Sequence, residues 1–195
     1  SDNDYRKNAE IGAGSAEAVI GESKKIMRDL NSVIISVYGK GMMRGRGVTE
    51  IMSLARATDT PVIVDPKGQD FSIYRGANVI TPNKKELLEA SGGMSVSSDQ
   101  DAAAAAMKII ERCDIDAVVA TRSADGMSVV QKSGGATHLQ GADIEVFDVS
   151  GAGDSVIATI AAVIAAGGNL IEAATLANLA GSLVVTKVGT APIRA

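Results

Sequence analysis

The sequence is poor in the residues that mark several classes of protein. Aromatic side chains make up 3 % of its 195 residues, tryptophan is absent, and there is one cysteine and one histidine. A single cysteine, Cys113, excludes a disulfide within the chain and favours a reducing, cytoplasmic compartment. We expect it to be buried as a small apolar side chain. The net charge of -4 argues against a nucleic-acid partner held by bulk electrostatics.

Long hydrophobic runs are also missing. No segment approaches the ~18 consecutive apolar residues of a membrane-spanning helix. The apolar run from Val156 to Ala166 has the length of a buried core helix, and residues 1–7 are too polar for a signal peptide. We therefore expect no membrane partner. The length indicates a single domain over residues 1–195 with a flexible N-terminus over residues 1–14.

Short β-branched runs alternate with helix-forming segments along the chain. The runs predict strands at residues 33–37, 61–66, 78–83 and 117–121, and a hairpin of 127–131 with 136–139. Apolar spacing and alanine content predict helices at residues 15–30, 48–58, 84–91, 99–111, 156–166 and 170–186. Strands separated by helices imply right-handed crossovers, and so an α/β fold with a mostly parallel sheet covered by helices on both faces.

Ligands bind at the carboxyl ends of the strands in sheets of this kind. The polar residues that the prediction places at those ends are Tyr38, Lys40, Asp65, Lys67, Asn83, Glu86, Thr121 and Ser123. They are therefore candidates for one shared site.

A glycine-rich loop, residues 147–154, opens directly into the apolar run at 156–166. Gly151 and Gly153 let the backbone approach an anion without a Cβ in the way, and the amides and dipole of a helix N-terminus attract negative charge. Asp154 adds a carboxylate beside that point, where it would repel a bound phosphate. Proton abstraction from an attacking hydroxyl is a reason for its presence. An ordinary helix start with glycine and aspartate is the alternative.

Three motifs resemble the ribokinase-like (PfkB) family of carbohydrate kinases. Residues 148–154 (Asp-Val-Ser-Gly-Ala-Gly-Asp) are similar to the family's C-terminal signature, 81–86 to its Asn-x-x-Glu element, and 121–126 to its nucleotide-loop strand end. The resemblance runs from about Val33 to Thr190. It implies a ribokinase-like three-layer α/β/α fold.

Three further segments resemble one branch of the family. Residues 36–41, 64–68 and 74–77 are similar to the kinase that phosphorylates D-glycero-β-D-manno-heptose 7-phosphate in ADP-heptose synthesis. The implied function is transfer of the γ-phosphoryl group of ATP to a sugar or sugar-phosphate hydroxyl. ATP and Mg²⁺ are the implied cofactors, with K⁺ activation as in part of the family.

The resemblance implies a role for each matching residue. Asp154 would be the catalytic base, and the amides of Gly151, Ala152 and Gly153 would neutralise charge on the moving phosphoryl group. Asn83 and Glu86 would orient magnesium through water. The nucleotide would be lined by Thr121, Ser123, Gly126 and Asn178. Lys67 would reach a phosphate, and Asp148 would belong to a monovalent-cation loop.

Structural alternatives stay open for most of these residues. Asn83 can cap the following helix beside a solvated Glu86, Gly126 can belong to a plain Asp-Gly turn, and Asn178 can be satisfied by neighbouring backbone. Lys67 can be a solvated loop lysine. The single histidine, His138, is expected to have no catalytic role.

The sequence departs from the family pattern in two places. The family's Gly-Gly sugar-binding motif and small β-lid do not precede the strand at 33–37, and Val37 stands where the heptose branch has an acid. We therefore expect the fold to lack the N-terminal strands and lid, which would expose a sheet edge and favour a homodimer. An idle nucleotide-binding remnant is the alternative function. A Rossmann dehydrogenase is disfavoured because no early strand leads into Gly-x-Gly-x-x-Gly.

Overall fold

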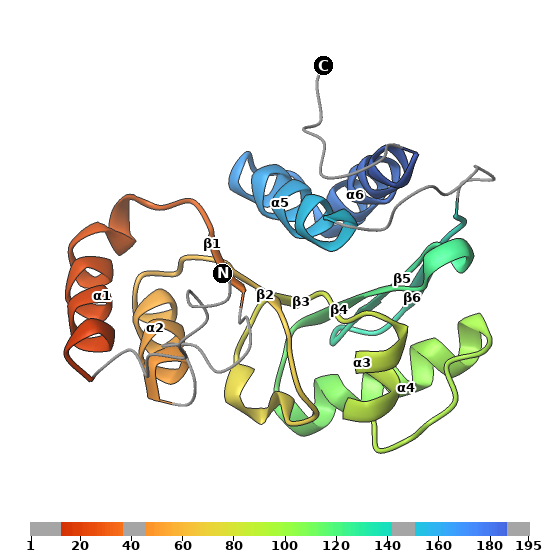
Figure 1. Cartoon of the computed structure of the whole chain (residues 1–195), viewed down its shortest axis with the longest axis horizontal. Coiled ribbons are helices and arrows are strands. Elements are labelled where there is room, and N and C mark those ends of the chain that lie inside the picture. Colours follow the sequence, from red (N-terminus) through yellow and green to blue (C-terminus); the bar gives the residue numbers. More distant parts are fainter. Residues whose placement is uncertain (1–12, 37–45, 142–150, 187–195) are drawn as a thin grey trace, which may run out of the picture.

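A six-stranded sheet forms the centre of the protein, with helices on both of its faces (Figure 1). The computed structural model describes residues 13–36, 46–141 and 151–186. The strands lie in the order of the sequence, namely β1 (Val33–Ser36), β2 (Val62–Asp65), β3 (Val79–Ile80), β4 (Ala117–Thr121), β5 (Met127–Gln131) and β6 (Ala136–Leu139). The three-layer α/β/α architecture is thus as the sequence predicts.

The helices also fall where the sequence places them, within a few residues. They are α1 (Ala13–Ile26), α2 (Arg46–Ala57), α3 (Lys84–Ala90), α4 (Asp99–Cys113), α5 (Ala152–Ala165) and α6 (Leu170–Val185). Three short 3-10 turns were not expected, and they are η1 (Met27–Asp29), η2 (Phe71–Tyr74) and η3 (Ser123–Asp125). The two largest shifts are the end of α1, which η1 follows, and the start of α5, where residues of the glycine loop form the first turn.

The sheet is parallel on one side and antiparallel on the other. β1 to β4 pair in parallel, whereas β4, β5 and β6 pair antiparallel. A parallel crossover needs a dozen or more residues, and β4 is joined to β5 only through Arg122, η3 and Gly126. The short loop therefore reverses the chain and forms one wall of the site described below.

Alternating side chains of the strands divide the core into two clusters. On β2, Ile63 packs with α5 and α6, while Val62 and Val64 pack on the opposite face with α2 and α4. Figure 1 shows α5 and α6 (blue) on one face and α1 to α4 on the other. Cys113 is fully buried in the larger cluster, as predicted. Among the described helices, none is both long and apolar enough to cross a membrane.

Helix α4 begins at a capping box. The Ser98 hydroxyl accepts a hydrogen bond from the Asp101 amide at 3.1 Å, and the Asp101 carboxylate accepts one from the Ser98 amide at 3.3 Å. Asp101 also accepts a hydrogen bond from the Ser95 hydroxyl at 2.8 Å. The hydrogen bonds from Ser95 and Ser98 hold the pKa of Asp101 below its ordinary value.

We expect this cap to weaken in acid. Because the pKa of Asp101 is lower in the folded than in the unfolded chain, its stabilisation is complete above about pH 4 and is lost as the pH falls through the folded pKa. Asp101→Asn should therefore lower Tm at pH 7 and have little effect near pH 2. Glu111→Gln, an exposed change on the same helix, is the control. An equal Tm difference at both pH values would contradict the prediction.

Candidate active site

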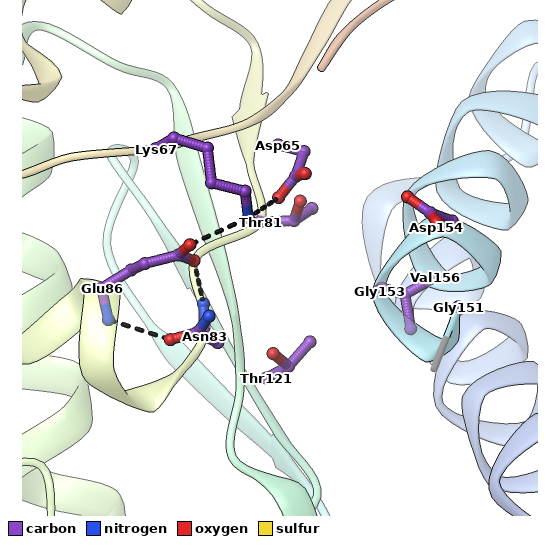
Figure 2. A pocket seen from close by; sticks show the side chains of 10 residues that line it. All are labelled: Asp65, Lys67, Thr81, Asn83, Glu86, Thr121, Gly151, Gly153, Asp154 and Val156. Carbon is purple, nitrogen blue, oxygen red and sulfur yellow. Dashed lines mark hydrogen bonds and ion pairs between the residues drawn. The ribbon is translucent and has the colours of Figure 1, made fainter. Parts of the chain in front are cut away.

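A cavity of about 180 Å³ lies where the carboxyl ends of β2, β3 and β4 meet the start of α5 (Figure 2). Its lining comes from segments far apart in the sequence, namely Asp65, Lys67, Thr81, Asn83, Glu86, Thr121, Gly151, Gly153, Asp154 and Val156. The position is the one expected for a ligand in a sheet of this kind. Eight of the sequence-predicted site residues are thereby brought together: Asp65, Lys67, Asn83, Glu86, Thr121, Gly151, Gly153 and Asp154.

The start of α5 forms one wall of this cavity. Gly151 precedes the helix with φ 78° and ψ 0°, a left-handed conformation that glycine adopts without strain. An added Cβ on Gly153 would meet no atom within 4 Å. Figure 2 shows the Asp154 carboxylate across the cavity from Asp65 and Thr81. First-turn amides lack partners within their own helix, so this wall offers N–H groups, free space and a carboxylate together.

Lys67 lies on the opposite wall between two carboxylates. Its Nζ is 3.1 Å from Asp65 Oδ1 and 2.9 Å from Glu86 Oε1. Burial by itself lowers the pKa of Lys67, but the hydrogen bond to Glu86 and the charge of Asp65 outweigh it, so the pKa lies above its ordinary value. The lysine is therefore a fixed cation at the cavity, and the alternative of a freely solvated loop lysine does not hold.

Asn83 and Glu86 form a capping box at the start of α3. The Asn83 side chain accepts a hydrogen bond from the Glu86 amide at 2.9 Å, and Glu86 Oε2 accepts one from the Asn83 amide at 2.9 Å. The capping alternative is thus confirmed for Asn83. The Glu86 side chain is only 12 % exposed, so the solvated part of that alternative is wrong. Both residues still line the cavity.

A second cavity of about 360 Å³ adjoins the first. It lies between the β4–β5 loop and the helices α5 and α6, and its lining is Thr121, Ser123, Ala124, Gly126, Met127, Gly141, Ala152, Gly153, Val156, Asn178, Gly181, Ser182 and Val185. Thr121, Gly153 and Val156 line both cavities. The predicted nucleotide residues Thr121, Ser123, Gly126 and Asn178 all belong to this second cavity.

Gly126 lies in close contact with another part of the chain. Its φ is 78°, and an added Cβ would lie 2.0 Å from the Leu139 carbonyl oxygen and 2.4 Å from the Gly141 nitrogen. The close approach at Gly126 is therefore to the chain's own backbone at the end of β6. This packing sets the shape of the second cavity.

Asn178 has a backbone partner and also lies at the second cavity. Its Nδ2 donates a hydrogen bond to the Gln140 carbonyl oxygen at 2.8 Å, so neighbouring backbone satisfies it, and it also lines the second cavity. The bond ties α6 to the segment that follows β6. His138 is outside both linings and is hydrogen-bonded to Ser128 at 2.9 Å.

Sequence reasoning missed several lining residues. Thr81 lies in the 81–86 motif, and its position at the end of a predicted strand could have marked it as a site residue. Gly181, Ser182 and Val185 lie three, four and seven positions after Asn178, the spacing of one helix face. Ala124 lay in the 121–126 motif, whereas Met127 and Gly141 carried no such signal. The predicted cation residue Asp148, and Tyr38 and Lys40, lie outside the described residues.

The first cavity carries carboxylates of the kind that hold Mg²⁺ together with phosphates. Within the described ranges, no group of three or more histidine, cysteine, aspartate or glutamate side chains could hold a metal by itself. Mg²⁺ is usually held by one or two carboxylates together with phosphates and water. Asp65, Glu86 and Asp154 can supply such carboxylates, and the space at Gly153 admits phosphate oxygens.

Comparisons with known proteins agree with this geometry. Residues 8–194 match the model of the pfkB family carbohydrate kinases. The bifunctional protein HldE of Rhodospirillum rubrum is 45 % identical over 180 residues, which are 92 % of this chain and 36 % of that protein. The chain thus spans well under half the length of this curated relative.

Solved structures share the fold at low sequence identity. Phosphofructokinase-2 from Escherichia coli in complex with potassium has a TM-score of 0.75 and 21 % identity, covering 89 % of this chain and 58 % of its own. Ribokinase from Arabidopsis thaliana with ribose and ATP has a TM-score of 0.70 and 20 % identity, covering 87 % and 54 %. Since the family model matches nearly the whole sequence, the chain belongs to the pfkB family of carbohydrate kinases.

Proposed function

We propose that the chain carries the nucleotide-binding and catalytic part of an ATP-dependent sugar kinase. The observation that carries the proposal is the placement of Asp154 at the first turn of α5, on a cavity whose far wall holds the fixed cation Lys67. A carboxylate and a cation around one anion-sized space are the groups that phosphoryl transfer needs. The adjoining cavity supplies room for the rest of a nucleotide.

Each wall has its own part in the reaction. Asp154 would accept the proton of the acceptor hydroxyl as that oxygen attacks. The amides of Gly151, Ala152 and Gly153, with the N-terminal end of α5, would stabilise charge on the transferring group. Lys67, kept cationic by Asp65 and Glu86, would hold a phosphate oxygen from the other side. Bound magnesium ATP supplies the phosphoryl group and a divalent charge.

The second cavity would take the nucleoside. Its lining combines apolar surface from Ala124, Met127 and Val185 with the polar groups of Ser123 and Asn178. A largely apolar cleft with a few polar groups is typical of small-molecule sites, and a volume of about 360 Å³ is in their usual range. We assign adenine to this cavity and the phosphates to the first.

The cations and the acceptor are finer points of the same proposal. We assign Mg²⁺ to the carboxylates of the first cavity, and K⁺ to the loop at Asp148 because the phosphofructokinase-2 neighbour was solved with potassium. The acceptor is heptose 7-phosphate. Its support is the resemblance at residues 36–41, 64–68 and 74–77 and the relationship to HldE proteins. A cytoplasmic homodimer stays a prediction.

The deciding experiment measures ADP release and ADP binding separately. The chain is given ATP, magnesium and either heptose 7-phosphate or a panel of simple sugars, and ADP binding is measured by calorimetry without acceptor. Turnover with heptose 7-phosphate above that of the sugars is the expected result. ADP binding without turnover would favour the alternative of a nucleotide-binding chain. Absence of ADP binding would overturn the proposal altogether.

A further inference from the structure

Arg122 is a buried charge directly behind the second cavity. It follows the last residue of β4 and is 4 % exposed. Strand alternation sends neighbouring side chains to opposite faces, so Thr121 lines the cavities while the Arg122 guanidinium lies on the α4 face of the sheet. It touches neither cavity.

Three elements meet at this guanidinium. Nη1 donates to Asp99 Oδ1 at the start of α4 and, at 3.0 Å, to the Ser128 hydroxyl on β5. Nη2 lies 4.0 Å from Asp125 Oδ2 in η3. Ser128 is in turn hydrogen-bonded to His138 Nδ1 at 2.9 Å. One side chain therefore joins α4, β5 and η3.

The backbone of the same residue closes the β4–β5 loop. The Arg122 amide donates to the Gly126 carbonyl at 2.8 Å, and the Arg122 carbonyl accepts from the Asp125 amide at 3.1 Å. Within this loop Ser123 has φ 56°, an unfavourable value for a residue with a side chain. Surrounding contacts must hold a strained residue in place. Arg122 contacts the loop on both sides of Ser123, through its backbone bonds to Asp125 and Gly126 and through Nη2 beside Asp125.

Burying a guanidinium is costly, and a buried ion pair is weak evidence for stability. Arg122 Nε is buried without a hydrogen-bond partner in the part of the chain that the structure describes. An apolar side chain would avoid that cost. A planar guanidinium, however, can bind several acceptors in fixed directions, which is useful where geometry matters more than stability.

We infer that Arg122 is a positioning residue. It holds the loop of Ser123, Ala124 and Gly126 in the position that a nucleoside in the second cavity requires. The inference rests on the proposed function, because it assumes that a nucleotide occupies the second cavity. It predicts that loss of Arg122 weakens contacts to the nucleoside and spares those to the phosphates at α5. The two parts of the ligand can be probed separately.

The test compares ADP with inorganic pyrophosphate as ligands. Arg122→Met should weaken ADP binding about tenfold, which is ~1.4 kcal/mol, and change pyrophosphate affinity by less than about twofold. Arg122→Lys should recover part of the loss, since an ammonium can reach Asp99 but lacks the second arm, Nη2, that faces Asp125. Lys132→Met, which removes an exposed ion pair with Asp114, is the matched control and should leave both affinities unchanged.

Three results would overturn the inference. If Arg122→Met binds ADP as tightly as the unchanged chain, the position of the loop does not depend on Arg122. Equal losses for ADP and pyrophosphate would show a general distortion. Failure of the unchanged chain to bind ADP would overturn the proposed function as well. If Arg122→Met does not fold, Asp99→Asn decides, with a loss for ADP of about threefold or more expected and no loss for pyrophosphate.

Discussion

Asp154→Asn is expected to abolish phosphoryl transfer while ADP binding persists. A general base contributes about 10²–10⁴-fold to a rate, and asparagine keeps the shape of the side chain while removing the basic oxygen. The change also removes a negative charge beside the phosphates, so ADP affinity should be unchanged or slightly higher. Steady-state turnover with heptose 7-phosphate and calorimetry with ADP measure the two effects.

Glu111→Gln is the matched control for this experiment. It makes the same carboxylate-to-amide change on an exposed position of α4 that lines neither cavity. We expect it to leave turnover and ADP binding unchanged. Residual turnover of Asp154→Asn within tenfold of the parent would show that another group takes the proton. Loss of ADP binding together with turnover would show that Asp154 has a structural role.

Gly126→Ala is expected to be strongly destabilising and to weaken nucleotide binding. A Cβ at this position would lie 2.0 Å from the Leu139 carbonyl oxygen, and φ is 78°. The clash is with backbone, which cannot move aside as a flexible side chain can. We expect the free energy of unfolding to fall by about 3 kcal/mol or more. Denaturant unfolding monitored by circular dichroism measures it, and ADP affinity should fall with it.

Gly134→Ala separates the two causes of that loss. Gly134 also has a positive φ, 96°, but an added Cβ there would meet nothing within 4 Å. Its substitution carries only the conformational cost of ~1–2 kcal/mol, and it lies in the turn between β5 and β6, away from both cavities. If both substitutions lower the free energy of unfolding by the same amount, the clash at Gly126 is not the cause of the loss. If Gly126→Ala leaves ADP affinity unchanged, Gly126 has no part in nucleotide binding.

Local patterns were sufficient for most of the secondary structure. The hairpin of β5 and β6 was predicted because Gly134 and Gly135 allow the positive φ values that its turn adopts. Helix α4 was predicted from alanine content, and Ser98 with Asp101 caps it. The η2 turn was missed although Asp70 caps its start, because its aromatic pair, Phe71 and Tyr74, is held by long-range burial.

Tyr74 shows how burial can assign a role that a motif leaves open. It lies in the segment 74–77 that resembles the heptose branch, yet the motif assigns it no role. In the structure its hydroxyl accepts a hydrogen bond from the Lys67 amide at 3.2 Å. The buried ring therefore supports the loop that presents the Lys67 cation. Only the folded chain brings these two residues into contact.

The sequence alone determined the fold class and the family, because these depend on short-range spacing and on motifs that are continuous in the chain. Tertiary structure decided the antiparallel reversal after β4, the pairing of Lys67 with Asp65 and Glu86, and the network behind Ser123. These features join residues from separate elements. Their geometry follows from packing across the sheet, which no local pattern records.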